Sequence, residues 1–296
     1  MNQTLTHRKI SITGDLGSGK SIIGRLLGQK TGFKFYSSGG IQREIASRHG
    51  ITTLALNKLS EQNHEIDKEI DDFTRDLSQT GESFVIDSRM AWYFIPNSFK
   101  IYLQVNVDIA AERILSDKSR KNEDYPDFDS AKEDIIKRKE SEIYRFKKYY
   151  DVDCENMDNY DLVINTSFST PEEIIAVILN NLSASIAPAC KHKYWYPPML
   201  LYPGKNPKEL EQEAAKQLVN AVKEKGYDNC FSVEVRNGDE FLLINDGHKR
   251  VSAALFNNIS FIPVKILPGN KQKINSRWLS DWENFHHFQF LVRPTK

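Results

Sequence analysis

A glycine-rich stretch at residues 14–21, Gly-Asp-Leu-Gly-Ser-Gly-Lys-Ser, follows an apolar run at residues 10–13 and precedes a segment with helical spacing. Its glycines let successive backbone N–H groups turn inward, and the following helix adds the positive end of its dipole. Lys20 can reach the outer phosphates of a nucleotide, and the Ser21 hydroxyl can hold magnesium. We therefore expect a phosphate-binding loop for ATP and Mg²⁺, although a chance match in a glycine-containing turn stays possible. The expected nucleotide-binding residues are Gly14, Asp15, Gly17, Ser18, Gly19, Lys20 and Ser21.

The composition narrows the class of protein. The chain has 296 residues, of which 40% are hydrophobic, enough for one large domain or two ordinary ones. Basic and acidic residues balance at 40 each, so no global positive field favours nucleic-acid binding. We find no apolar run of signal-peptide or membrane-helix length, and we expect a cytoplasmic protein without a membrane partner. The three cysteines, Cys154, Cys190 and Cys230, lie far apart, and we expect them to be reduced.

The chain divides into two blocks with different rhythms. In residues 1–183, short apolar runs alternate with helical patterns, which predicts an α/β domain with a parallel sheet flanked by helices. The expected strands are residues 10–13, 33–36, 84–87, 101–105 and 162–164. Residues 184–204, rich in proline and aromatic side chains, indicate a linker.

Residues 205–296 predict a smaller α+β domain with an aromatic C-terminal extension. A helix is expected over residues 206–225, started by Asn206-Pro207 and ended by Gly226. Two apolar runs then flank Asn237-Gly238, the strongest hairpin signal in the chain. The other expected elements are a short helix that ends at Phe256 and a strand at residues 262–267.

A set of polar residues around the glycine-rich loop suggests phosphoryl transfer. Asp87 ends the strand at residues 84–87, where it can hold magnesium together with Ser21, although a simple strand-end acid is the alternative. Phosphoryl transfer needs positive charge around the moving group, so arginines are the residues to seek. Taken singly, each arginine is more often merely solvated.

The order of these motifs resembles the cytidylate kinase family, particularly its short type, which lacks an inserted substrate domain. The resemblance covers about the first 180 residues. Besides the glycine-rich loop, it rests on residues 36–43 (YSSGGIQR), 65–71 (EIDKEID), 85–89 (VIDSR), 137–145 (KRKESEIYR) and 160–167 (YDLVINTS). Together these motifs are specific, whereas singly only the glycine-rich loop is.

The resemblance implies roles for particular side chains. Arg43, Arg89 and Arg145 would clamp the acceptor and transferred phosphates, and Ser38 would lie beside the acceptor. Arg138 and Glu142 would sit near its sugar and phosphate, on a lid that closes over both substrates. This gives Lys20, Arg89, Arg138 and Arg145 as catalytic residues, and Ser38, Arg43, Arg89 and Glu142 as substrate-binding residues. Some family members carry an aspartate after the arginine that helps read cytosine, whereas this chain has Met90.

The second block contains its own candidate anion site, in the sequence Asp-Gly-His-Lys-Arg at residues 246–250. The N-terminal amides of the helix expected there can bind an anion, with His248, Lys249 and Arg250 as cationic donors. The expected second-site residues are Asp246, Gly247, His248 and Arg250. A helix start with surface cations is the plain alternative.

The order of hairpin, Asp-Gly-His-x-Arg motif, short helix and strand resembles the ParB and sulfiredoxin superfamily over residues 231–267. That superfamily includes nucleotide-binding clamps and a free-serine kinase. The cysteine that sulfiredoxins need is absent, with His248 at the corresponding place. A nucleotide- or DNA-binding role, or a second phosphotransfer site, therefore stays open.

Three functions fit the sequence. The leading one is a kinase that moves the γ-phosphate of ATP onto a nucleoside monophosphate of the CMP or dCMP kind. The second keeps this chemistry but uses a specialised acceptor presented by the C-terminal domain, such as a hydroxylated base in DNA, free serine or another small alcohol. The third is a non-catalytic, nucleotide-switched DNA-binding protein. The oligomeric state is left open.

Overall fold

The computed structural model describes residues 5–51, 64–117, 125–209, 212–238 and 241–286. Their contacts divide the chain into two compact units. The first unit comprises Met1–Val163 and Ile174–Ala184, and the second comprises Ile164–Glu173 and Ser185–Lys296. Each unit is described by itself.

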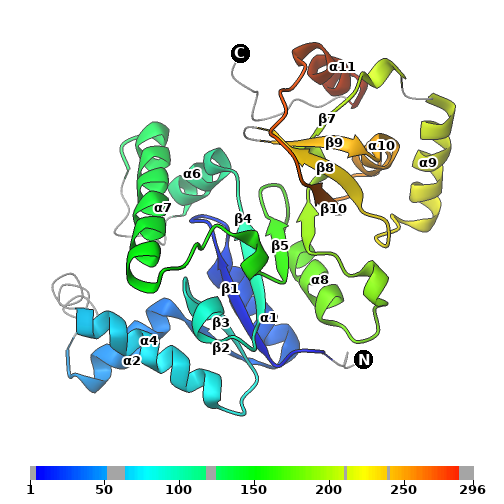
Figure 1. The fold of residues 1–296 in the computed structure, drawn as a ribbon. Coiled ribbons are helices and arrows are strands. Elements are labelled where there is room, and N and C mark those ends of the chain that lie inside the picture. Colours follow the sequence, from blue (N-terminus) through cyan, green and yellow to red (C-terminus); the bar gives the residue numbers. More distant parts are fainter. Residues whose placement is uncertain (1–4, 52–63, 118–124, 210–211, 239–240, 287–296) are drawn as a thin grey trace. The chain divides into compact units, whose positions relative to one another are not determined.

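The first unit is built on a sheet in the order β2-β3-β1-β4-β5 (Figure 1). The bounds are β1 Lys9–Gly14, β2 Lys34–Ser37, β3 Phe84–Asp87, β4 Phe99–Gln104 and β5 Leu162–Asn165. Strand β1 pairs in parallel with β3 and with β4, and β2 pairs in parallel with β3. The predicted α/β fold with a parallel sheet is confirmed for this unit, and each of its predicted strands is present to within two residues.

Helices follow the strands of the first unit. They are α1 Lys20–Thr31, α2 Ser38–Arg48, α4 His64–Gln79, α5 Ala91–Phe94, α6 Val107–Ser116, α7 Phe128–Tyr150 and α8 Pro171–Leu182, with a 3₁₀ turn at Met157–Asn159. Side-chain caps fix several starts: Ser37 accepts from the N–H of Gly40, and Asp127 accepts from that of Ser130. In the described ranges, we find no helix that is both long and apolar enough to cross a membrane.

The parallel arrangement places the functional motifs at one edge of this sheet. Strands β1 and β3 are neighbours that run in the same direction, and both are nearly inaccessible to solvent, as Ile10, Ile12 and Ile86 at 0% exposure illustrate. Their carboxyl ends therefore deliver the loop after β1 and Asp87 at the end of β3 to the same place. The first unit thus brings together two motifs that lie about seventy residues apart in the sequence.

The second unit has a mixed sheet in the order β6-β10-β8-β9-β7 (Figure 1). Its elements are β6 Tyr194–Tyr196, β7 Leu201–Pro203, α9 Gln212–Lys225, β8 Val233–Asn237, β9 Leu242–Asp246, α10 His248–Phe256, β10 Ile262–Leu267 and α11 Ser276–His286. Short 3₁₀ turns lie at Pro188–Cys190, Pro198–Leu200 and Pro207–Glu209. The antiparallel pair β8–β9 is the predicted hairpin, while Asp239, placed in its turn, lies outside the described residues.

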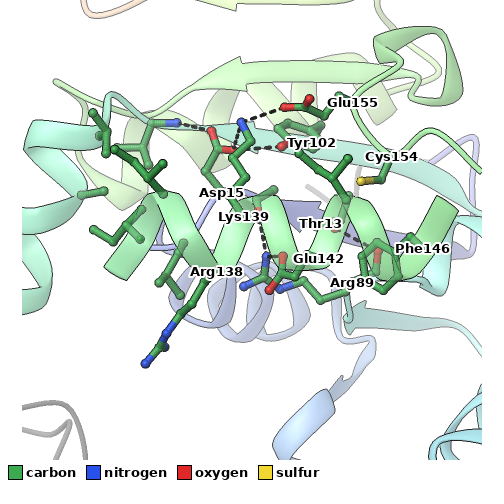
Figure 2. A pocket seen from close by; sticks show the side chains of 18 of the residues that line it. Thr13, Asp15, Arg89, Tyr102, Arg138, Lys139, Glu142, Phe146, Cys154 and Glu155 are labelled. Carbon is green, nitrogen blue, oxygen red and sulfur yellow. Dashed lines mark hydrogen bonds and ion pairs between the residues drawn. The ribbon is translucent and has the colours of Figure 1, made fainter. Parts of the chain in front are cut away.

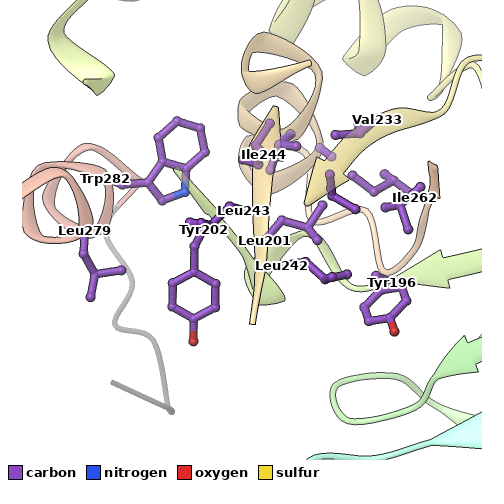
Figure 3. Packing of buried hydrophobic residues seen from close by; sticks show 14 residues of the cluster. Tyr196, Leu201, Tyr202, Val233, Leu242, Leu243, Ile244, Ile262, Leu279 and Trp282 are labelled. Atoms are coloured by element: carbon purple, nitrogen blue, oxygen red, sulfur yellow. The ribbon is translucent and has the colours of Figure 1, made fainter. Parts of the chain in front are cut away.

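Residues 184–204 were predicted to be a linker, and this prediction is partly wrong because the segment contains two strands. Strand β6 pairs antiparallel with β10, and β7 pairs in parallel with β9. Leu201 and Tyr202 are buried in the same cluster as Ile244 and Trp282, whose indole is fully buried (Figure 3). Both strands were missed in the sequence for two reasons. Each is only three residues long, and the prolines around them are unusual in strands.

The cysteine prediction is corrected as well. Cys190 and Cys230 form a disulfide within the second unit, whereas Cys154 is free. Spacing in the sequence could not reveal this pairing, because the fold alone brings residues 40 positions apart into contact. The last aromatic residues of the predicted C-terminal extension, Phe288 and Phe290, lie outside the described residues.

Candidate active site

The loop between β1 and α1 adopts a backbone that requires glycine. Gly14 has a φ of 142°, and a Cβ placed there would lie 2.1 Å from the carbonyl oxygen of Leu103 in β4. A Cβ on Gly17 would lie 2.8 Å from that of Ala110 in α6. Gly19 then precedes α1 in the left-handed conformation, with a φ of 87°. These positions allow the close turn that carries the loop amides into the N-terminus of α1.

Lys20, the first residue of α1, is folded onto the loop that precedes it. Its Nζ donates to the carbonyl oxygen of Gly14 at 2.9 Å and to that of Asp15 at 2.6 Å. Burial, followed by repulsion from Arg89, lowers the pKa of Lys20 to about 8, while Asp87 and other nearby carboxylates act in the opposite direction. The ammonium is therefore still mainly charged at neutral pH, and its present acceptors are neutral carbonyls that a phosphate oxygen can replace.

Ser21 and Asp87 form the second part of the site. The Ser21 hydroxyl donates to Oδ2 of Asp87 at 2.5 Å, and the Ser38 hydroxyl donates to the Asp87 carbonyl at 3.0 Å. Asp87 is 7% exposed. A hydroxyl and a carboxylate oxygen are hard ligands of the kind magnesium prefers beside phosphate and water, so this pair fits the predicted Mg²⁺ ligands.

Arg89 connects this edge of the sheet with the long helix α7 (Figure 2). One of its guanidinium nitrogens forms an ion pair with Oε2 of Glu142 and lies 3.5 Å from the carbonyl oxygen of Gly14. Its own carbonyl oxygen accepts from the Thr13 hydroxyl at 3.3 Å. The structure thus brings the predicted residues Arg89 and Glu142 together beside the loop.

The other predicted arginines lie on helices in more open positions. Arg138 and Arg145 are seven residues apart on α7, so they point to the same side of the helix. Arg138 lines the edge of the pocket described next and pairs with Asp134 at 2.8 Å, while Arg145 is exposed and does not line it. Arg43 is exposed on α2, with its guanidinium against Gly39. The structure does not bring these three arginines into contact with Lys20.

A cavity of about 160 Å³ lies between the loop, β4 and α7, and it contains residues that the sequence analysis missed. The Asp15 carboxylate points into it and accepts from the Tyr102 hydroxyl at 2.9 Å and from the Val105 N–H at 3.0 Å (Figure 2). The Nζ of Lys139 lies 3.3 Å away. Lys139 lies inside the motif at residues 137–145, but no local pattern assigns it or Tyr102 to Asp15, because only the fold places β4 and α7 next to that residue.

Arg113 is a further neighbour of the loop, since its guanidinium donates to the carbonyl oxygen of Gly17 at 3.3 Å. Burial lowers the pKa of this guanidinium. Met90, in contrast, is 5% exposed in the core. Its apolar side chain offers a base no hydrogen bond of the kind that an aspartate at this position would.

In the second unit, the structure places Asp246, Gly247, His248 and Arg250 at the start of α10. Arg250 is engaged, because it donates to the Ser232 carbonyl at 2.7 Å and pairs with Asp246 at 3.2 Å. The prediction that His248 is a cationic donor is wrong. Its ring is 3% exposed, and burial, followed by repulsion from Lys205, lowers its pKa to about 4. His248 is therefore neutral at pH 7.

A parallel sheet whose first strand leads into a glycine-rich loop and a lysine-led helix, with an acidic residue ending the next strand, defines a P-loop kinase-like protein. The model of the cytidylate kinase-like family matches residues 9–168, and the chain belongs to this family. It is a phosphotransferase of the nucleoside monophosphate kinase-like kind.

Individual relatives agree with this assignment. The chain is 38% identical to a cytidylate kinase of Sulfolobus acidocaldarius over 177 residues, which are 59% of this chain and 94% of that protein. It is 36% identical to a cytidylate kinase of Methanobrevibacter smithii over 58% of this chain and 97% of that protein. Among solved structures, shikimate kinase from Acinetobacter baumannii in complex with shikimate matches 59% of this chain and 92% of that chain, at 18% identity and a TM-score of 0.41. That similarity is too low to bear on function.

Proposed function

We propose that the first unit transfers the γ-phosphate of ATP to a nucleoside monophosphate, most favourably CMP or dCMP. The observation that carries the proposal is the family match over residues 9–168, in which the loop, Asp87 and Arg89 occupy one edge of the sheet. The loop amides and Lys20 hold the ATP phosphates. Arg89, Arg43 and Arg145 neutralise the acceptor and transferred phosphates, with Ser38 beside the acceptor.

Two further groups complete the proposed site. Arg138 and Glu142, on α7, bind near the acceptor's sugar and phosphate. Ser21 and Asp87 would hold Mg²⁺, which supplies charge neutralisation between the donor phosphates when it is bound. The residues otherwise need only to orient the two substrates, to offset charge and to exclude water, because phosphoryl transfer requires no covalent intermediate on the protein.

The test is an assay of the purified full chain with ATP, Mg²⁺ and a panel of ribo- and deoxyribonucleoside monophosphates, read by chromatography of the diphosphate products. We expect CDP or dCDP to form fastest, and a Lys20→Met variant to form almost none. If no monophosphate yields a diphosphate, the proposal fails. In that case, tight ATP binding together with salt-dependent binding of DNA would favour a nucleotide-switched DNA-binding protein instead.

A second candidate function concerns the C-terminal unit, and a buried donor at the start of α10 favours it. The Gly204 N–H donates to Nε2 of His248 at 3.2 Å, so the neutral ring carries its proton on Nδ1. Within the described residues, this buried Nδ1 has no hydrogen-bond partner. A buried N–H without an acceptor is costly, and the amides of α10 start at the same residue, after Gly247 with a φ of 100°.

We propose that an oxygen of an anionic or hydroxyl-bearing ligand accepts this hydrogen bond in a ParB/sulfiredoxin-like domain. The domain comprises residues 205–296, with β6 and β7 added to its sheet, and residues 1–183 form the kinase domain. The ligand can be a specialised phosphate acceptor, such as a hydroxylated base in DNA, free serine or another small alcohol, or a nucleotide.

His248→Phe tests this second candidate, because phenylalanine has a similar ring and removes both nitrogen atoms. We expect the variant to lose phosphate transfer to serine or to hydroxymethylated DNA while it keeps CMP phosphorylation. The candidate fails if the wild-type chain transfers phosphate to none of these acceptors and if no nucleotide protects the α10 amides from hydrogen exchange.

A further inference from the structure

Asp15 belongs to the phosphate-binding loop, but its polar groups are used elsewhere. Its backbone N–H donates to the Leu103 carbonyl at 2.9 Å, and its carboxylate accepts from Tyr102 and Val105. Its carbonyl oxygen accepts from Lys20. No donor of Asp15 is left for a phosphate, and an acidic side chain beside a triphosphate disfavours binding unless it is neutralised. The role of Asp15 is therefore different from that of the other loop residues.

Lys139, on the α7 face that lines the cavity, supplies the neutralising charge (Figure 2). Its Nζ lies 3.3 Å from Oδ1 of Asp15 and 3.1 Å from Oε1 of Glu155. Burial alone would lower the pKa of Lys139, but Asp15 and Glu155 outweigh this effect and raise it. The Asp15 side chain is 15% exposed, so solvent screens its attraction to Lys139 less than it would for a fully exposed carboxylate.

A second ion pair joins the same helix to the same loop. Glu142 follows Lys139 by three residues and so lies on the same face of α7, where it pairs with Arg89. The two ion pairs differ in how firmly the residue that is not on α7 is held in place. Asp15 is fixed by two donors from the β4 region, whereas Arg89 contacts one loop carbonyl at 3.5 Å and faces the space in which substrate phosphates are proposed to bind.

We propose that Asp15 and Lys139 are positioning residues that hold α7 over the phosphate-binding loop, while Glu142 releases Arg89 to the substrate phosphates. This inference rests on the proposed kinase function. Arg138 directly precedes Lys139 on α7, and Glu142 follows it by about one turn. The ion pair between Asp15 and Lys139 therefore keeps these two residues at the distance from the phosphate-binding loop that transfer requires. A lateral error of about 1 Å in such groups costs up to about 10²-fold in rate.

The experiment is a double-mutant cycle in the full chain with Asp15→Asn, Lys139→Met and the double variant. Tyr102 and Val105 donate to different oxygens of Asp15, so Asp15→Asn removes the charge and one of these two hydrogen bonds, whereas Lys139→Met removes the charge pair alone. Lys137→Met, at an exposed position of α7, is the matched control. We expect each single variant to lower kcat by about tenfold or more, with less than about a threefold change in the KM for ATP. The double variant should be no slower than Asp15→Asn, and the control should stay within about twofold of wild type.

Hydrogen exchange of the α7 amides, measured without nucleotide, separates this inference from the proposed function. We expect faster exchange over Phe128–Tyr150 in both Asp15→Asn and Lys139→Met, and unchanged exchange in Lys137→Met. This readout decides the inference even if no monophosphate is phosphorylated. Additive rate losses, an effect confined to KM, or unchanged exchange would overturn it. If Asp15→Asn does not fold, Tyr102→Phe, which removes one donor to Asp15, is expected to loosen α7 in the same direction.

Discussion

Two helices in this chain begin with the same backbone conformation but with different first side chains. Both α1 and α10 follow a glycine in the left-handed conformation, Gly19 with a φ of 87° and Gly247 with a φ of 100°, and neither has a side-chain cap. The first side chain of α1 is Lys20, which is mainly charged at neutral pH, and that of α10 is His248, which burial keeps neutral. The backbone of the helix start is thus similar in the two places, and the first side chain decides which ligand charge each one suits.

The surroundings of the two helix starts reinforce this difference. Beside α1, a hydroxyl and a carboxylate that fit magnesium lie 2.5 Å apart, as needed for a ligand with several negative charges. At α10, Arg250 is already paired with Asp246 and contributes little free positive charge. These differences support the proposal that the first helix start binds a polyphosphate and the second a ligand that accepts a single hydrogen bond.

The largest effect is expected from removing the cation of the first helix start. Lys20→Met should lower kcat/KM for the kinase reaction by about 10³-fold, because the variant removes the ammonium group proposed to stabilise the negative charge on the ATP phosphates. Lys30→Met, an exposed position at the other end of the same helix, is the control and should leave steady-state kinetics unchanged. Equal activity of the two variants would mean that the charge of Lys20 does not distinguish the start of α1 from that of α10.

Asp87→Asn should lower kcat about 10²-fold and raise the magnesium concentration that gives half-maximal activity. The amide can still accept the Ser21 hydroxyl, so the variant removes the negative charge and little else. A magnesium titration of the rate checks this expectation. A rate loss with no shift in the magnesium requirement would show that Asp87 only supports the Ser21 hydroxyl.

The pH dependence should reveal the protonation of Lys20. Because its pKa is lowered to about 8, kcat/KM for ATP should fall as the pH rises above 8, approaching tenfold per unit as the ammonium is lost. The measurement is a pH profile of the wild-type chain between pH 6 and 10. Lys20→Arg stays charged across this range, so its profile should be flat on the alkaline side, whatever its absolute rate.

The smallest effect, on stability alone, is expected at the second helix start. Because the pKa of His248 is 6.5 in an ordinary environment and about 4 in the fold, the unfolded chain binds more protons between these values. Its contribution to stability is complete above pH 6.5 and is lost as the pH falls towards 4, by up to about 3 kcal/mol. Urea denaturation of wild type and His248→Phe at several pH values measures the difference. Parallel pH curves would show that folding does not lower the pKa of His248.

Much of the first unit could be predicted from the sequence because its signals are local. Apolar runs of strand length, the glycine pattern at residues 14–21 and an acid at the end of β3 each report on their own neighbourhood, and parallel strands then place them at one edge. The second unit was harder to predict. Its three-residue strands β6 and β7 lie among prolines, and their pairing with β10 and β9 depends on residues far away in the chain.

The phosphate-binding loop, the parallel α/β sheet and the hairpin of the second unit follow from the order of the residues, because backbone conformation and apolar periodicity depend on neighbouring residues. Which side chains meet depends on the tertiary structure. The fold places the Asp15 carboxylate next to Lys139 and joins Cys190 to Cys230. It also buries His248, which lowers the pKa of this side chain and keeps it neutral at pH 7. Charge state and partner depend on burial and on segments distant in the chain, and no local pattern of residues encodes either.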